Sequence, residues 1–417
     1  MRSVLPVAAL LSLFLSTGTL AACSTGGSTP AVSAAEQTAA AQRTPEPARS
    51  HAPAHPASSS APLAAAAPGP KKPLTGLIDM QNIAWHNSDT EEPSFVIDNV
   101  TKYPGVFGGI VINATWRALQ PKEGGELDTS TVDAALEKVR AYNAANPSAP
   151  LGVKLRAYEG SSAPEWAKHI GGGPVSIERN PKGCANAPCK LTVGKYWSAE
   201  YIAAWREFQK RLAEKYDDEP LIRQVAVTSC APQTDEPFVS TTEKPSRKAL
   251  EEAGYGDATE KACLLGAIDD YAPWKHTLVD YTINTFVKVG GGVDDAFPKT
   301  VMKKCREELG ARCVLDNHAL SAPLRESDKE VYDTMASMKG AINFQTEAPR
   351  GMGCEWRAAI AQGVEIGAAA IEVWPDAKYQ GFTTLSDANV RELAGEFTSP
   401  IPVPKPGPHK EGCTGFH

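Results

Sequence analysis

The chain has 417 residues, with 42 Lys and Arg against 49 Asp and Glu and a formal net charge of −7. A mildly acidic chain without a basic cluster is poorly suited to bind nucleic acid or anionic lipid, so we exclude both as partners. Nine Cys in a chain that opens on an export-type segment indicate disulfides rather than metal binding or thiol catalysis.

The first residues have the layout of a secretory signal peptide. Arg2 supplies a positive charge, an apolar run follows over residues 4–15, and the segment closes on Leu20-Ala21-Ala22-Cys23. This apolar run is too short for a transmembrane helix. Small residues followed by Cys resemble the bacterial lipobox, which implies cleavage after residue 22 and lipidation of Cys23. The alternative is ordinary signal cleavage, with Cys23 incidental.

Residues 23–72 are dominated by Ala, Pro, Ser, Thr and Gly. Such a segment cannot bury enough apolar surface to offset its conformational entropy, so we predict a disordered tether. Residues 73–417 are then one large α/β domain. We expect an exported monomer, anchored by lipid to the outer face of a bacterial membrane and touching the membrane only through that anchor.

From residue 73 on, short β-rich runs alternate with helical patterns. The predicted strands are Leu77–Gln81, Gly109–Asn113, Gly152–Tyr158, Gln224–Thr228, Tyr281–Val287, Cys313–His318, Ala341–Glu347 and Ala369–Trp374. The predicted helices are Thr131–Asn143, Ala199–Tyr216, Lys299–Leu309, Lys329–Met338, Glu355–Gln362 and Asp387–Phe397. This order predicts a (β/α)8 TIM barrel. The alternative, an open doubly wound sheet, is disfavoured because no Gly-rich phosphate loop follows a strand, and Gly290–Gly292 lacks the required spacing.

Two segments are predicted insertions in the barrel plan. Residues 171–197 indicate a small hairpin over the barrel mouth, and residues 231–271 form a long connection after the fourth strand. Long loops between strand and helix usually shape the substrate cleft of a barrel.

Without Cys23, eight Cys remain, which is an even number for an exported chain. Sequence proximity suggests the pairs Cys184–Cys189, Cys305–Cys313, Cys230–Cys263 and Cys354–Cys413. We find no CxxC pair and no HExxH stretch, so no metal and no cofactor is expected.

The strand Ala341–Glu347 carries the most informative pattern. Ile342 and Phe344 form an apolar face, whereas Asn343, Gln345 and Glu347 form a polar one. A buried strand seldom has a polar face unless that face lines a cavity. Because barrel enzymes keep their catalytic groups at the C-terminal strand ends, Glu347 is the first catalytic candidate.

Other strand ends send polar or aromatic side chains to the same end of the barrel. They are Asn113 and Trp116 from the second strand, Arg156 from the third, His318 from the sixth, and Glu372 and Trp374 from the eighth. Carboxylates, amides, Arg and Trp suit a neutral polyhydroxylated ligand. Breaking a glycosidic bond needs two carboxyl groups with different pKa values.

The stretch 109–121 resembles the second-strand region of barrel glycoside hydrolases, and so do Lys154-Leu155-Arg156, Ala163-Pro164-Glu165-Trp166 and Glu372-Val373-Trp374. The resemblance is to the retaining cellulase and beta-galactosidase clan. It implies a nucleophile Glu ending strand seven, which Glu347 matches, and an acid/base Glu after strand four. The family pattern at the latter is Asn-Glu-Pro at the strand end, whereas this chain has Asp235-Glu236-Pro237 several residues beyond it.

On this resemblance the protein is a retaining glycosidase that acts on an oligo- or polysaccharide, with Glu347 as nucleophile and Glu236 as acid/base. Asn113 and Arg156 would hold substrate hydroxyls or orient the nucleophile, and Trp374 would floor a subsite. Trp116 and His318 are further substrate contacts. Glu372 is a fallback nucleophile, or orients substrate or an Arg.

Structural readings compete with these roles. Glu347 can be a buried carboxylate paired with Arg156 or Arg117, Glu236 a solvated loop residue, and His318 a structural histidine. For the whole chain, the rival is a catalytically silent sugar-binding lipoprotein on the same barrel. A cell-surface structural protein is a third possibility.

The anchor is tested by changing Cys23 to Ser. We expect the variant to leave the membrane fraction while its domain stays folded, because the acyl chains attach through that sulfur. Fractionation with circular dichroism of the soluble protein measures both. A Cys23→Ser protein that stays with the membrane would refute the lipidation.

Overall fold

Eight parallel strands form the core of the computed structural model, which describes residues 69–179, 189–236, 244–349 and 355–403. They are hydrogen-bonded in the order β10-β7-β6-β3-β2-β1-β12-β11. The strands are β1 (Gly76–Asp79), β2 (Phe107–Thr115), β3 (Gly152–Tyr158), β6 (Ile222–Ala226), β7 (Leu278–Thr282), β10 (Cys313–Asp316), β11 (Asn343–Gln345) and β12 (Ala370–Val373). All eight predicted strands therefore exist, although several are shorter than predicted.

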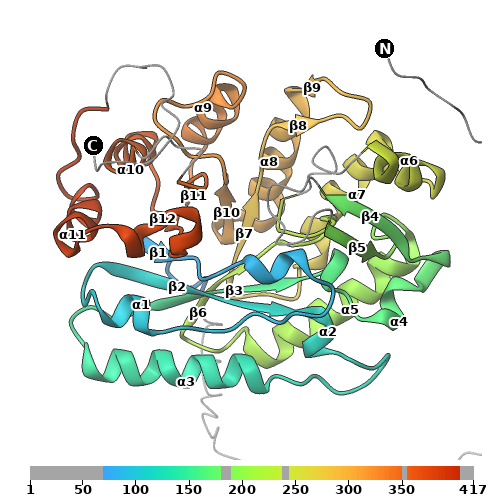
Figure 1. Cartoon of the computed structure of the whole chain (residues 1–417), viewed down its shortest axis with the longest axis horizontal. Helices are drawn as coiled ribbons and strands as arrows, with labels where there is room; N and C mark the ends of the chain where they lie inside the picture. The colour runs from blue at the N-terminus through green and yellow to red at the C-terminus, as the bar shows by residue number, and fades with distance from the viewer. Residues whose placement is uncertain (1–68, 180–188, 237–243, 350–354, 404–417) are drawn as a thin grey trace, which may run out of the picture. The chain divides into compact units, whose positions relative to one another are not determined.

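The two edge strands of this sheet, β10 and β11, meet and close it into a barrel (Figure 1). Parallel bridges join Leu315 to Ile342 and Leu320 to Thr346. Beyond the end of β11, the amide of Glu347 donates to the carbonyl of Leu320 at 2.9 Å. The predicted (β/α)8 barrel is thus confirmed.

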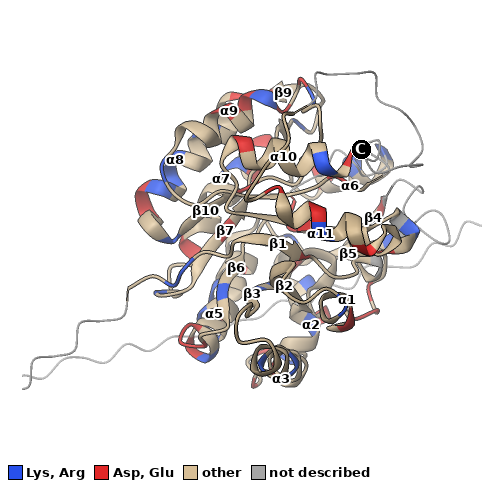
Figure 2. Ribbon diagram, turned by 90° about the vertical axis from the view of Figure 1, so that its left-hand side faces the viewer, with Lys and Arg blue, Asp and Glu red and all other residues tan. Residues whose placement is uncertain are grey.

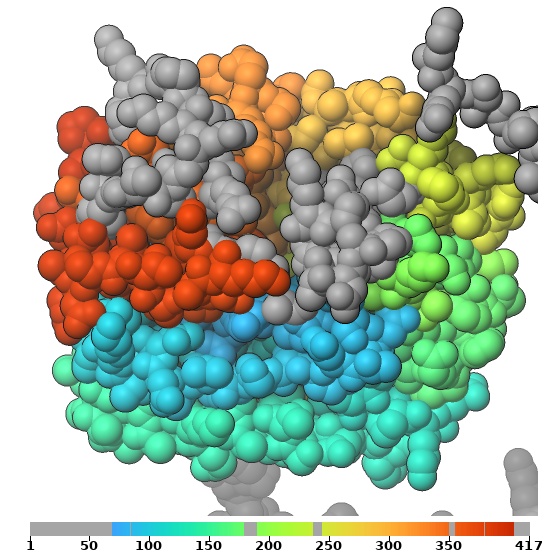
Figure 3. Space-filling model, viewed as in Figure 1, coloured from blue at the N-terminus to red at the C-terminus, as the bar shows by residue number. Residues whose placement is uncertain are grey.

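The first and last strands of the domain, β1 and β12, are neighbours in the sheet. On the surface, Lys102 lies 2.9 Å from Asp387 of α11 (Asp387–Gly395). Figure 3 shows the early, blue part of the domain against its late, red part on this face. The barrel therefore brings residues from both ends of the described chain together.

Helices cover the outside of the barrel (Figure 1). Besides α11, the longer ones are α3 (Ser130–Ala145), α5 (Ala199–Tyr216), α6 (Lys244–Glu252), α7 (Asp257–Asp270), α8 (Ala296–Leu309), α9 (Lys329–Ser337) and α10 (Trp356–Ile366). The short ones are α1 (Asp98–Thr101), α2 (Trp116–Leu119) and α4 (Glu165–Lys168). The six predicted helices are all present, and α6 and α7 lie in the long connection after β6. Within the described ranges, no helix has the length and apolar character needed to cross a membrane.

Helix α5 illustrates how local sequence sets these elements. It begins after Ser198, whose hydroxyl accepts a hydrogen bond from the amide of Tyr201. Trp205, Phe208 and Leu212 then recur at three- and four-residue spacing, and all three are fully buried. Its predicted bounds and the predicted core position of Trp205 are both confirmed.

Charged residues of both signs alternate on the outward helix faces, as Figure 2 shows for α8 and α9. Along α8, Lys303 pairs with Glu307 and Lys304 with Glu308 at the four-residue spacing of neighbours on one helix face. These exposed pairs contribute little to stability and leave the outer surface mixed in sign.

The predicted hairpin in residues 171–197 is present as β4 (Val175–Arg179) paired antiparallel with β5 (Cys189–Val193). Two of the predicted disulfides, Cys230–Cys263 and Cys305–Cys313, are confirmed. Cys184, Cys354 and Cys413 lie outside the described residues, so the pairs Cys184–Cys189 and Cys354–Cys413 stay predictions.

The predicted strand Tyr281–Val287 is wrong in most of its extent, because it overlaps β7 only at Tyr281 and Thr282. Strand β7 ends at Thr282, and β8 (Phe286–Val287) forms a separate hairpin with β9 (Val293–Asp294). The break follows from Asn284, whose side-chain oxygen accepts the amide of His318 at 3.0 Å and so faces the barrel mouth. The hairpin turns at Gly291 and Gly292, which both have positive φ, so the Gly-rich run is a loop as predicted.

The described chain enters at the N-terminal ends of the barrel strands. The Lys71 ammonium donates at 2.8 Å to the carbonyls of Glu219 and Ile222 and to the hydroxyl of Thr277. Ile222 opens β6, and Thr277 immediately precedes β7. The entry segment is thus fixed at the barrel end opposite to Glu347.

A buried ammonium group lies inside the barrel. Lys154 of β3 points inward, and its nitrogen lies 2.5 Å from Asp280 of β7, 2.9 Å from Asp316 of β10 and 2.6 Å from Glu372 of β12. All four side chains are at most 2% exposed. Four strands are therefore joined by one set of ion pairs. Asn343 of β11 adds a fifth, because its amide donates to Asp280 at 2.7 Å.

The charges in this cluster compensate one another. Burial alone would lower the pKa of Lys154, but the three carboxylates raise it above its ordinary value. Burial and the neighbouring Asp316 raise the pKa of Asp280. Burial opposes ionisation of Asp316 too, yet Lys154 and His318 hold its pKa below the usual range. We therefore expect the two aspartic acids to share a proton that resides on Asp280.

Changing Lys154 to Met should destabilise the domain by roughly 3–5 kcal/mol, because the buried carboxylates lose their cation. Urea unfolding measures this. The same change at the exposed Lys303 is the matched control and should alter stability by about 0.5 kcal/mol or less. Equal effects of the two substitutions would contradict the role of the cluster.

Candidate active site

Glu347 lies two residues beyond β11, at the C-terminal end of the barrel. Its side chain is only 8% exposed and forms an ion pair with Arg325, whose side chain is half exposed. Arg325 belongs to the loop between β10 and α9. The cation beside Glu347 therefore comes from this loop, and neither Arg156 nor Arg117 provides it; Arg117 instead pairs with Glu92.

The environment of Glu347 shifts its proton affinity. Burial raises its pKa, Arg325 lowers it, and the charges of Asp328 and Glu236 raise it again, with a resulting pKa of about 6. Glu347 is thus mostly ionised at neutral pH. The contribution of Glu236 shows that the two carboxylates are within electrostatic reach of each other.

Glu236 follows β6 through the loop 227–236. Its Oε1 accepts a hydrogen bond from the amide of Asn284 at 2.8 Å, and the Nδ1 atom of His318 lies 3.8 Å from the same oxygen. The side chain is 22% exposed, so it is more accessible than Glu347. The predicted pair of carboxylates is therefore present in one region of the barrel mouth.

His318 is buried behind Glu236. Its Nε2 atom lies 3.1 Å from the hydroxyl of Thr282 and 3.4 Å from Asp316, while Nδ1 faces Asp235 at 3.7 Å. Burial lowers the pKa of His318, but Asp235 and Asp316 outweigh it and bring the pKa to about 9. The ring therefore carries a positive charge at neutral pH.

Arg156 connects the barrel interior to the loop of Glu236. Its guanidinium lies 2.7 Å from Asp235 and 2.8 Å from Glu372, and it is 1% exposed. This differs from the expectation that Arg156 orients Glu347 or holds substrate. Glu372 forms ion pairs with both Arg156 and Lys154. Of the roles predicted for Glu372, the structure agrees with the one in which it orients an arginine.

Asn113 and Trp374 occupy positions at the barrel mouth. The Asn113 amide donates to the Met80 carbonyl at 3.2 Å and its oxygen accepts from Tyr158 at 3.4 Å. Trp374 follows β12, is partly exposed, and donates from its indole nitrogen to the carbonyl of Thr346 at 2.9 Å. Thr346 directly precedes Glu347, so the indole is hydrogen-bonded to the residue next to that carboxylate.

Trp116 is placed in the core, in contrast to the expected substrate contact. It is fully buried and packs against Trp166, Trp205 and Phe208 with ring centroids 5.1–5.4 Å apart. Helix α2 begins at Trp116, so the strand alternation that places Asn113 no longer applies there. A side chain with no exposed surface cannot stack on a sugar.

Arg325 and Asn284 were not among the predicted site residues, and Asp235 had no predicted role. Arg325 lies in a long loop without periodicity, where one sequence carries no positional signal. Asn284 was hidden inside the over-long strand. A polar residue directly after the buried pair Thr282-Ile283 is the signal that could have marked a strand end.

No group of three or more His, Cys, Asp or Glu among the described residues is arranged to hold a metal ion. The charged groups at the mouth instead bind one another through Arg156, His318 and Arg325. The chemistry that this arrangement offers is proton transfer and nucleophilic attack by carboxyl groups.

No known sequence family matches this chain, and neither does the sequence of any curated protein. Among solved structures, endo-glycoceramidase II from Rhodococcus sp. in complex with ganglioside GM3 is similar over 72% of this chain and 74% of its own, at 15% identity and a TM-score of 0.45. The catalytic domain of a beta-amylase from Paenibacillus polymyxa is similar over 78% of this chain and 99% of its own, at 10% identity and a TM-score of 0.46. An endo-beta-1,4-glucanase from Xanthomonas axonopodis pv. citri is similar over 78% of this chain and 99% of its own, at 13% identity and a TM-score of 0.45. At these values the similarity carries no argument about activity, so the chemistry rests on the residues of the site.

Changing Arg325 to Gln should raise the pKa of Glu347 above its present value of about 6, because the variant loses the cation that favours the ionised form. A rise of about one unit is expected for a half-exposed partner. Titration of the Glu347 carboxyl by carbon-13 NMR measures it. Arg325→Lys keeps the charge and is the matched control. An unchanged pKa in Arg325→Gln would show that the ion pair does not hold in solution.

Proposed function

We propose that this protein is a glycoside hydrolase that acts by the retaining two-carboxylate mechanism, with Glu347 as nucleophile and Glu236 as acid/base. The observation that carries the proposal is the difference between two neighbouring carboxylates at the C-terminal end of a barrel. Glu347 is buried and ion-paired with Arg325, whereas Glu236 is partly exposed and held by Asn284. Such a difference lets two chemically equal groups take different roles.

In the first step, a Glu347 oxygen attacks the anomeric carbon while Glu236 donates its proton to the departing glycosidic oxygen. In the second step, Glu236 takes a proton from water, and the resulting hydroxide oxygen displaces Glu347 from the sugar. Arg325 favours the ionised form that the attack requires. Arg325 contacts Oε1 of Glu347, whereas Oε2 has no hydrogen-bond partner among the described residues, so the attack falls to Oε2.

The acid/base role requires a proton on Glu236 when the substrate is bound. In the free protein, the imidazolium of His318 favours an ionised neighbour. A bound sugar would displace water from the mouth, and desolvation favours the protonated carboxyl. We therefore expect Glu236 to gain its proton in the substrate complex.

The substrate class follows from the side chains at the mouth. Asn113, Trp374 and the carboxylates present amide, indole and acceptor groups. Indole rings pack against the C–H faces of sugar rings, and carboxylates accept hydrogen bonds from hydroxyl groups. We infer an oligo- or polysaccharide substrate. On this proposal, the tether predicted over residues 23–72 ends before Lys71, which is fixed to the barrel. It belongs to an exported, lipid-anchored enzyme that meets its substrate at the cell surface.

The roles are tested with Glu347→Gln and Glu236→Gln on a panel of aryl-glycosides and polysaccharides, using the chain from residue 69, which keeps the contacts of Lys71. Glu347→Gln should abolish turnover but leave sugar binding intact, because an amide keeps the shape but cannot attack. Glu236→Gln should lose roughly 10²–10⁴-fold on substrates with poor leaving groups and much less on activated ones, with rescue by azide.

Each alternative predicts a different pattern. A glycosyl azide of retained anomeric configuration from Glu347→Gln, and none from Glu236→Gln, would reverse the two roles, because retention requires that azide attacks a glycosyl-enzyme intermediate. Wild-type activity in both variants would refute the site. Binding of oligosaccharides without cleavage of any glycoside by the wild type would establish the rival, a sugar-binding lipoprotein.

A further inference from the structure

The segment 228–236 follows β6 and ends at Asp235 and Glu236. Its first residues form hydrogen bonds with several neighbouring elements. The amide of Thr228 donates to the Tyr271 hydroxyl at 3.0 Å. The hydroxyl of Ser229 accepts from the indole of Trp205 at 2.7 Å and donates to Asp270 at 3.3 Å. The loop is thus tied to two outer helices, α5 and α7, before it reaches the site.

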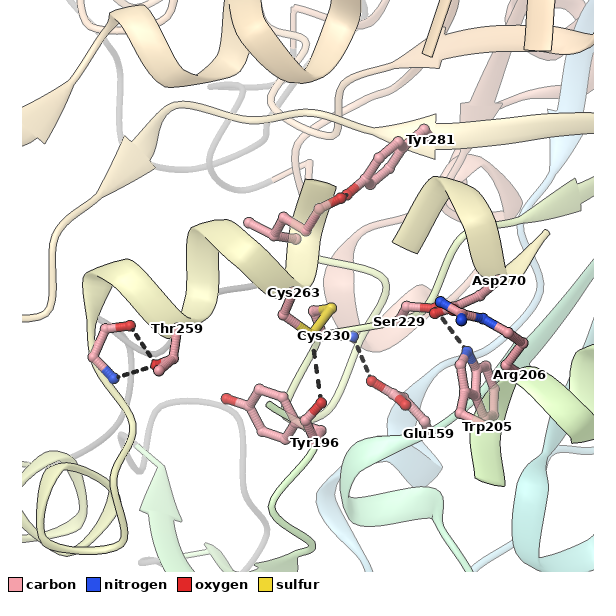
Figure 4. Close-up of a disulfide and its surroundings, with 12 residues drawn as sticks. Glu159, Tyr196, Trp205, Arg206, Ser229, Cys230, Thr259, Cys263, Asp270 and Tyr281 are labelled. Atoms are coloured by element: carbon pink, nitrogen blue, oxygen red, sulfur yellow. Dashed lines mark hydrogen bonds and ion pairs between the residues drawn. A yellow bond between two sulfur atoms is a disulfide. The ribbon is translucent and has the colours of Figure 1, made fainter. Parts of the chain in front are cut away.

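Cys230 is the most constrained residue of this segment. Its φ of 66° lies in the left-handed region, which residues other than glycine rarely adopt. Its sulfur is bonded to Cys263 of α7, and its amide donates to the buried carboxyl of Glu159, which follows β3. Figure 4 shows Glu159 aimed at the backbone of Cys230, with the disulfide on the other side. The side chain of Cys230 is therefore held by α7, and its backbone by the loop that follows β3.

The loop after β3 provides a third attachment. The amide of Ser161 donates to the carbonyl of Pro232 at 2.9 Å. At Gly160, with φ of +60°, an added Cβ would collide with the carbonyl oxygens of Ala231 and Pro232. The close contact of the two loops therefore requires glycine at this position.

The charge state of Glu159 suits this contact. Burial raises its pKa well above the ordinary value, and the hydrogen bond from Cys230 offsets that only in part. Burial thus favours the neutral form of this carboxyl, and in either form its oxygen accepts the Cys230 amide. A glutamine has nearly the same shape and the same acceptor.

We propose that Glu159 and the Cys230–Cys263 disulfide form a clamp that sets the position of Glu236 for proton transfer. Glu159 and the two cysteines are positioning residues, since they act through the backbone of residues 230–232. The proposal rests on the proposed function as far as proton transfer is concerned. The clamp itself is a property of the loop and is measurable without any substrate.

The first experiment compares Glu159→Ala with Glu159→Gln. The Ala variant loses the acceptor of the Cys230 amide, so we expect faster hydrogen exchange over residues 228–236 and unchanged exchange in the barrel strands. With the proposed substrates, its kcat should fall by about 10²-fold where the leaving group needs a proton, the loss that a displacement of about 1 Å brings. Activated leaving groups should be spared. The Gln variant should behave like the wild type on both readouts.

The second experiment compares the pair Cys230→Ser/Cys263→Ser with the pair Cys305→Ser/Cys313→Ser. Both remove one disulfide, but Cys305–Cys313 joins α8 to the start of β10, at the opposite end of the barrel. Only the first pair should accelerate exchange over residues 228–236 and reduce the proton-dependent kcat. If the first pair does not fold, the Glu159 variants decide the question.

The outcomes separate the clamp from the proposed function. Unchanged exchange over residues 228–236 in a folded Glu159→Ala protein would refute the clamp. The same would follow if activated and poor leaving groups lost activity equally, because that pattern indicates a general structural effect. Faster exchange in a protein whose wild type cleaves no glycoside would support the clamp and refute the glycosidase.

Discussion

The ion pairs of the Lys154 ammonium are the interactions on which the rest of the structure depends. Three carboxyl groups from β7, β10 and β12 surround it, and each of their side chains is at most 2% exposed. Each charge is therefore tolerated inside the barrel only because the others are present. A hydrophobic interior would close a barrel equally well, so the cluster indicates an interior selected for charge placement as well as for packing.

The ion pairs of the barrel interior are connected to the mouth, because some residues contact charged groups in both places. Glu372 contacts both Lys154 and Arg156, Arg156 reaches Asp235, and Asp235 precedes Glu236 in the chain. On a second route, Asp316 contacts Lys154 and His318, which faces Glu236. Glu236 is thus held by groups anchored deep in the barrel. Glu347, in contrast, takes its cation from the half-exposed Arg325 of a surface loop.

Patterns within one element were sufficient to predict much of the architecture. Alternation along β11 marked Glu347, and the spacing of Trp205, Phe208 and Leu212 marked α5. The partners of the charged residues were not predictable, because they are set by barrel closure, which brings together residues such as Lys154 and Glu372 that are distant in sequence. Trp116 shows the other limit. This residue directly follows β2 and was expected at the mouth, but the chain turns into α2 there and its side chain lies in the core.

The anchoring of Lys71 has a consequence for how the barrel meets large molecules. Its ammonium ties the entering chain to the N-terminal ends of β6 and β7, whereas Glu236 and Glu347 lie at the opposite rim. A force applied through the entering chain would act on the rim that carries no candidate catalytic group. The point where the chain enters and the two candidate carboxylates are therefore separated by the height of the barrel.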